Sequence, residues 1–90
     1  MTDINQELKE LKQLMLEAPE GHIAPVAMDT IKEWDETPKA IQVLKTLDMC
    51  VHSGLTSGFA TWALESILNI CMEQEKTTFE EVVKNATWRT

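Results

Sequence analysis

Apolar side chains recur at helical spacing near the start of the chain. The positions Ile4, Leu8, Leu11 and Met15 follow one another at i, i+4, i+7 and i+11. They form a narrow apolar seam on an otherwise polar segment, which is typical of a surface helix. The pattern predicts a helix from Asp3 to about Glu17, with Thr2 or Asp3 as its N-cap.

Two further patterns follow a break that is rich in proline and glycine. Ala27, Ile31 and Trp34 share one face and predict a short helix from Pro25 to Trp34. Thr37-Pro38 then predicts the start of a new helix, because proline suits the first helical position. The next helix is expected from Pro38 to about Ser53. Its apolar arc consists of Ala40, Val43, Leu44, Leu47, Cys50 and Val51.

The second half of the chain carries the most apolar helix. Gly54 suits a left-handed helix end, and Thr56 or Ser57 can cap the helix expected from about Gly58 to Glu75. Its apolar side comprises Phe59, Ala60, Ala63, Leu64, Ile67, Leu68, Ile70 and Cys71. Two overlapping T-x-x-E capping boxes then start a last helix, with the buried stripe Phe79, Val82, Val83 and Ala86 and a tail from Trp88 to Thr90.

These patterns predict one all-α domain over residues 1–90, a four- or five-helix, bundle-like fold with a central helical hairpin. The hairpin is formed by the helices expected at 38–53 and 58–75, and the first and last helices pack around it. Three glycines, two phenylalanines and no tyrosine are poor material for a sheet. The seam of the first helix fits docking against the domain's own core. It also fits a partner's groove or a two-chain seam, although two heptads are short for a coiled coil.

The net charge of −7, from 15 acidic and 8 basic residues, excludes a phosphate-binding surface of clustered Lys and Arg. We therefore expect no direct nucleic-acid binding; such acidity suits a basic partner. Between Met49 and Met72 the only Asp, Glu, Lys or Arg is Glu65, but the segment 53–58 divides this stretch into pieces too short to span a membrane. The polar first residues predict no secretory leader, and two cysteines suit reduced, buried thiols in the cytoplasm.

No catalytic, metal or cofactor site is predicted. The groups that could supply one are His22, Cys50, His52, Cys71 and the carboxylates. The only close pair is Cys50 and His52, and side chains two residues apart on a helix point roughly 200° apart. They cannot converge on one zinc ion, and no phosphate-binding loop, nucleophile motif or dinucleotide fingerprint occurs.

Trp62 is a large apolar residue on a helical face that is otherwise polar. On a helical wheel it falls among Thr61, Glu65, Ser66, Asn69 and Glu73. Met72 lies at the edge of the same side, and Met49 lies on the polar arc of the preceding helix. Large apolar residues on polar faces are typical of contact surfaces, and Trp is enriched at binding hot spots. Alternatively, the first helix, the 19–30 loop or the Trp88 tail covers Trp62.

We predict a non-enzymatic protein–protein interaction module, a small acidic adaptor, regulator or inhibitor. Trp62, Met49 and Met72 are the expected anchors, and Glu65, Glu73 and Glu75 form an acidic rim that orients the partner. One alternative is a homo-oligomeric structural or assembly subunit. Another is an acidic nucleic-acid mimic of the kind found among small phage-encoded inhibitors or accessory proteins.

Overall fold

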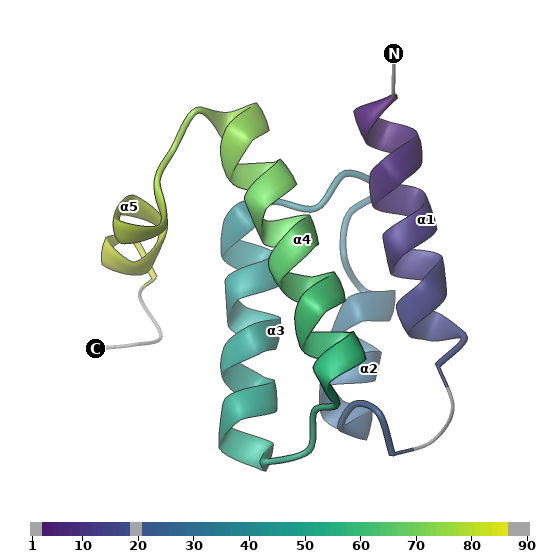
Figure 1. Cartoon of the computed structure of the whole chain (residues 1–90). Helices are drawn as coiled ribbons and strands as arrows, with labels where there is room; N and C mark the ends of the chain where they lie inside the picture. The colour runs from purple at the N-terminus through teal and green to yellow at the C-terminus, as the bar shows by residue number, and fades with distance from the viewer. Residues whose placement is uncertain (1–2, 19–20, 87–90) are drawn as a thin grey trace.

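A computed structural model describes residues 3–18 and 21–86, and within these ranges the chain forms five α-helices (Figure 1). They are α1 (Ile4–Leu16), α2 (Pro25–Lys32), α3 (Ala40–Ser53), α4 (Gly58–Glu75) and α5 (Phe79–Lys84). The described part of the chain contains no strand, only an isolated antiparallel bridge between Ile23 and Thr56. The predicted all-α class is confirmed. None of the described helices is long and apolar enough to cross a membrane.

The centre of the fold is the α3–α4 hairpin, in which the two helices run antiparallel along each other (Figure 1). α1 packs on α4 and on α2, and α2 packs on α3. α5 contacts α3 on the other side of the hairpin. This is the predicted arrangement, and α1 uses its apolar seam within the domain.

Several of the predicted helix ends are confirmed by their capping contacts. Asp3 Oδ1 accepts the backbone N–H of Asn5 at 3.0 Å, which satisfies a donor at the start of α1. Gly54 ends α3 in the left-handed region, with φ of 70°. Ser57 Oγ then accepts the N–H of Ala60 at 3.1 Å and starts α4.

The start of α3 differs from the prediction. The helix begins at Ala40 rather than Pro38, and its N-cap is Lys39 rather than Thr37. Two contacts hold this start: the Gln42 side chain accepts the backbone N–H of Lys39 at 2.9 Å, and Glu75, the last residue of α4, accepts the backbone N–H of Ala40 at 2.6 Å. A local cap and a carboxylate from another helix therefore both satisfy donors at the positive end of the α3 dipole.

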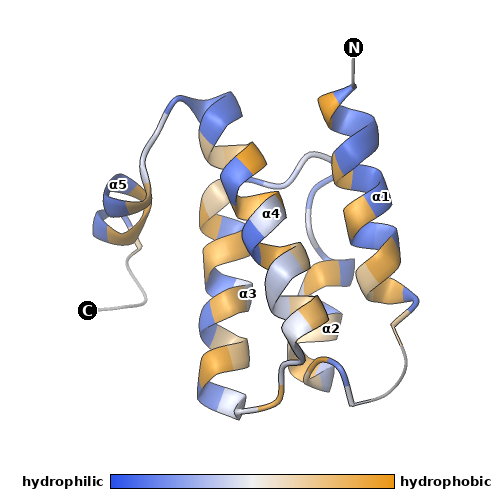
Figure 2. Ribbon diagram, in the orientation of Figure 1, coloured by the Kyte–Doolittle hydropathy of each residue, from blue (hydrophilic) through white to orange (hydrophobic). Residues whose placement is uncertain are grey.

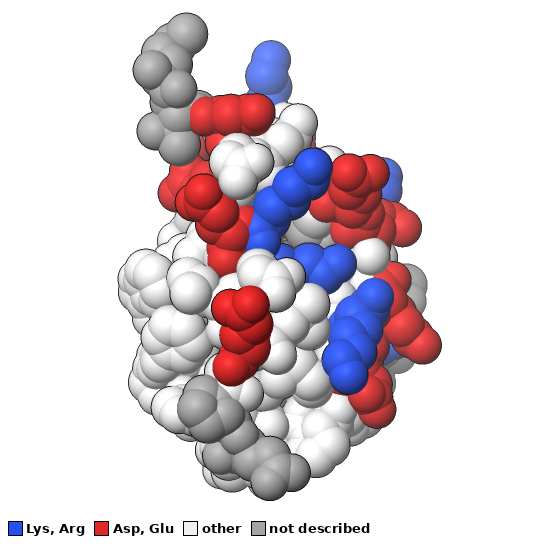
Figure 3. Space-filling model, turned by 90° about the vertical axis from the view of Figure 1, so that its right-hand side faces the viewer, with Lys and Arg blue, Asp and Glu red and all other residues white. Residues whose placement is uncertain are grey.

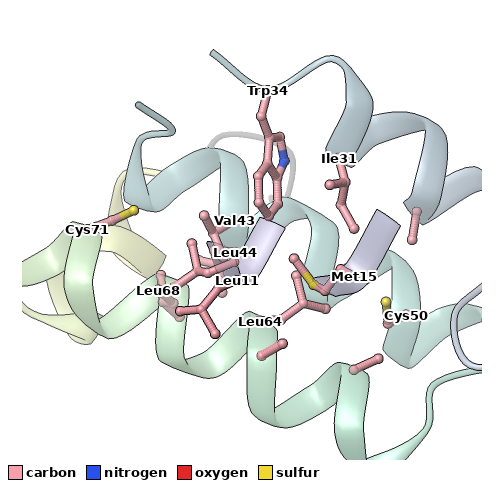
Figure 4. Close-up of a cluster of buried hydrophobic side chains, with 14 of the residues drawn as sticks. Leu11, Met15, Ile31, Trp34, Val43, Leu44, Cys50, Leu64, Leu68 and Cys71 are labelled. Carbon is pink, nitrogen blue, oxygen red and sulfur yellow. The ribbon is translucent and has the colours of Figure 1, made fainter. Parts of the chain in front are cut away.

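The core lies where α1, α2, α3 and α4 meet, and Figure 4 shows its side chains converging from these helices. Hydropathy colouring shows α1 as mainly hydrophilic, with a few hydrophobic positions, whereas α3 and α4 are richer in hydrophobic residues (Figure 2). Trp34 follows the end of α2 and is 6% exposed. Its indole Nε1–H donates to Thr46 Oγ1 at 3.1 Å, and the Thr46 hydroxyl donates to the Gln42 carbonyl at 3.0 Å. The one fully buried polar side chain among the described residues is thus doubly hydrogen-bonded.

Four residues assigned to apolar stripes lie at the surface instead. They are Ile4, Phe59, Val51 and Phe79, with exposures of 41%, 39%, 77% and 51%. Val51 and Phe79 are the clearest corrections. Val51 lies on the last turn of α3, and Phe79 is the first residue of α5, in which Val82 is buried but Phe79 is not. A helical stripe is buried only as far as a neighbouring element covers it.

We expect Thr46→Val to lower the free energy of unfolding by about 1–3 kcal/mol, because the indole N–H of Trp34 loses its acceptor while it stays buried. Urea denaturation followed by circular dichroism measures this loss. Thr46→Ser keeps the hydroxyl and serves as control. A Thr46→Val protein as stable as the wild type would contradict the assignment.

Candidate interaction surface

Trp62 lies on the outer side of α4, away from the core. Its neighbours Ala63 and Leu64 are fully buried, whereas Trp62 is 52% exposed. Of the segments considered as covers, neither α1 nor residues 21–30 bury the indole. Residues 19–20 and the Trp88 tail lie outside the described residues. The indole therefore presents about half of its surface on a helical ridge.

Two further rings extend from Trp62 towards the segment before α2. The Phe59 ring lies one turn earlier on α4, with its centroid 6.1 Å from the Trp62 ring at 39°. The His22 ring meets Phe59 edge-on at 6.2 Å, and His22 Nδ1 lies 2.8 Å from Ser57 Oγ. Such ring pairs are worth about 0.5–1.5 kcal/mol beyond area burial, so they hold Trp62 in place.

The surface near the start of α4 is poor in charge. Figure 3 shows the side of the molecule formed by α1 and α2, where Lys, Arg, Asp and Glu gather towards the upper part and the right edge. The lower left part is largely uncharged, and it lies at the end of the molecule where α4 begins.

Two of the three predicted acidic rim residues lie at different distances from Trp62. Glu65 and Glu73 are exposed on the outer side of α4. Glu65 lies one turn from Trp62, whereas Glu73 lies three turns away, or roughly 16 Å along the axis. Glu75, the third predicted rim residue, is directed to the start of α3 by its hydrogen bond to Ala40.

Met72 is half-buried and borders a groove between α3, α4 and the start of α5. We call this the α3–α4 groove; it has a volume of about 490 Å³ and is lined by Leu44, Leu47, Asp48, Val51, Glu65, Leu68, Asn69, Met72 and Phe79. A hollow of about 260 Å³ adjoins it and is lined by Leu47, Cys50, Val51, Gly54, Thr56, Thr61 and Glu65. Sequence reasoning missed this groove because Val51 and Phe79 were assigned to the core.

Met49 lies apart from the other predicted anchors. It packs against the core beside α2, where its Sδ accepts the Thr30 hydroxyl at 3.3 Å. Val51, two residues later, points roughly 200° away and lines the groove. The structure therefore brings Trp62, Glu65 and Met72 to neighbouring parts of α4 but does not join Met49 to them.

The candidate chemical groups do not gather into a site. Cys50 and Cys71 are free, buried thiols at opposite ends of the core cluster (Figure 4). His52 is exposed on the last turn of α3, with Nδ1 3.7 Å from Asp48 Oδ2. Over residues 3–18 and 21–86, no three His, Cys, Asp or Glu residues come together as a metal site would require.

A scan against protein-family models, a search of curated proteins and a search of solved structures each found no match.

We expect the buried thiol of Cys71 to make the free energy of unfolding depend on pH. Burial, and secondarily the Glu75 carboxylate, raise the pKa of the Cys71 thiol from 9.0 to about 11, and Sγ donates to the Pro38 carbonyl at 3.1 Å. Because the folded thiol holds its proton more tightly, the native state gains stability from it below pH 9 and loses that gain between pH 9 and about 11. Denaturant titrations across this range should show a steeper fall for the wild type than for Cys71→Ala; parallel curves would contradict the assignment.

Thr56 is a position at which we expect a substitution to leave the stability of the fold intact. Its Oγ1 is buried without a hydrogen-bond partner among the described residues. Thr56→Val keeps the shape and removes this unpaired hydroxyl, so we expect the free energy of unfolding to stay unchanged or to rise by up to about 1 kcal/mol. Thermal and urea denaturation provide the measurement, with Thr56→Ser as the variant that retains the hydroxyl. A loss above about 1 kcal/mol for Thr56→Val would show that the hydroxyl has a partner.

Proposed function

We propose that this chain is a non-enzymatic protein–protein interaction module, a small acidic adaptor, regulator or inhibitor that acts by occupying a partner's surface. The observation that carries the proposal is the position of Trp62: half-exposed, on the side of α4 opposite the core, and in contact with a second exposed ring, Phe59. A large ring that contributes little to the core has its remaining apolar area free for another molecule.

The energy available at Trp62 is substantial. A Trp side chain offers up to about 250 Å² of surface. Covering the exposed half at about 25 cal/mol per Å² gives roughly 3 kcal/mol, or about two powers of ten in a dissociation constant. Because Phe59 already restricts the indole, little rotamer entropy is lost when a partner covers it.

The acidic charge of the chain supports a basic protein as the partner. The chain carries a net charge of −7, and Glu65 and Glu73 lie on the same helix as Trp62. Exposed carboxylates around an apolar anchor favour a basic partner and speed its encounter, an effect that salt screens. The two buried, free cysteines fit a reducing compartment such as the cytoplasm.

We expect Trp62→Ala to weaken partner binding at least tenfold while it lowers the free energy of unfolding by less than about 1 kcal/mol, because the ring lies outside the core. The partner is first isolated by affinity capture from nuclease-treated lysate of the source cells. The dissociation constant of the purified pair is then measured by calorimetry, and stability by thermal denaturation.

Val26→Ala is the matched control, because Val26 on α2 is 54% exposed and apolar but distant in sequence from α4. It should leave binding unchanged. The proposal would be overturned if Trp62→Ala bound the partner as tightly as the wild type does. A large drop in the melting temperature of the Trp62→Ala variant would overturn it as well. A concentration-dependent mass that Trp62→Ala abolishes would instead favour the homo-oligomeric subunit.

A further inference from the structure

The α3–α4 groove lies on a side of the hairpin that α1 and α2 leave open. Among the described residues, those that line the groove or the adjoining hollow belong to α3, to α4, to the turn between them or to Phe79 at the start of α5. α1 and α2 pack on other sides of the same two helices. Within residues 3–18 and 21–86, the groove thus opens on a side of the hairpin that neither α1 nor α2 lines.

The groove is long enough to hold a short helix. Leu44 and Leu68 are buried at its floor, while Val51 and Phe79 stand exposed at its edges. The two linings share Leu47, Val51 and Glu65, so the groove and the hollow are continuous. From Leu44 to Gly54 the α3 edge measures about 15 Å at 1.5 Å per residue, which matches about three turns of a docked helix.

The described residues that line the groove carry charge of one sign. Among them the charged side chains are Asp48 and Glu65, and no described lining residue of the groove or the adjoining hollow is Lys or Arg. The imidazole of His52 lies beside Asp48. A second copy of the chain would bring another net charge of −7 to this acidic edge, so like-charge repulsion opposes self-association here.

We propose that the α3–α4 groove binds an amphipathic α-helix of a partner protein, with an apolar stripe on the groove floor and Lys or Arg beside Glu65. The inference rests on the proposed function and names the surface and the chemistry of the partner. The docked helix places apolar residues at i, i+4 and i+7 between Val51 and Phe79, in the helix-in-groove mode. Trp62 is not part of the groove lining and forms a separate contact on the outer ridge of α4.

The test is selection from a phage-displayed library of amphipathic helical peptides against the immobilised full chain. The charged positions of the library are randomised between acidic and basic residues. Selected peptides should carry a three-turn apolar stripe flanked by Lys or Arg. The best peptide is then titrated against variants by fluorescence anisotropy, at low and at high salt.

Val51→Asp and Glu65→Lys should each weaken peptide binding at least tenfold, and salt should weaken binding to the wild type. The matched controls on α1 are Leu14→Asp, at an apolar residue that is 45% exposed, and Glu10→Lys, at an exposed carboxylate. Each control should change binding less than twofold. Circular dichroism checks that all four variants keep the fold.

Three results would overturn the inference. The first is no enrichment of basic amphipathic peptides, and the second is selected peptides whose affinity neither groove variant changes. The third is a dimer of the chain that Val51→Asp dissociates into monomers. The proposed function fails separately. If Trp62→Ala abolishes capture of the cellular partner while the groove variants do not affect it, the interaction module stands and only the groove assignment falls.

Discussion

The fold depends on burying the shared face of the α3–α4 hairpin. A chain of 90 residues can build only one core, and here that core is the seam at which α3 and α4 meet α1 and α2. Small side chains on both helices of the hairpin, Ala40, Ala60 and Ala63, are almost completely buried and let the helices approach closely. Once this seam is closed, the side of α4 that carries Trp62 necessarily faces outwards.

Contacts between elements distant in the sequence hold the two ends of the hairpin. At one end the turn after Gly54 is tied to the segment before α2, through Ala24 N–H to the Leu55 carbonyl at 3.1 Å and Ser57 N–H to the His22 carbonyl at 2.7 Å. At the other end Glu75 caps α3. These contacts tie both ends of the hairpin to other parts of the chain, and both candidate contact surfaces lie on the hairpin.

The surface of the hairpin divides into two parts with different physical character. The ridge of α4 presents rings held by their neighbours, and its contribution is apolar area at low entropic cost. The α3–α4 groove presents an aliphatic floor with carboxylates beside it, and under the proposal above shape and sign of charge would select its partner. A partner that engaged both parts would gain from two anchors on one hairpin.

The sequence by itself determined the helices and most of their caps, because periodicity, capping residues and Gly54 act within a few residues of one another. It also placed Trp62 on the polar side of its helix, since a wheel depends only on spacing. The exposure of Val51 and Phe79 and the contact of Glu75 with the start of α3 were decided by tertiary structure alone. An apolar stripe does not say how far its neighbour extends, and the carboxylate that caps α3 lies 35 residues away in the chain. The groove and the separation of Met49 from Trp62 follow from that packing, which local spacing does not encode.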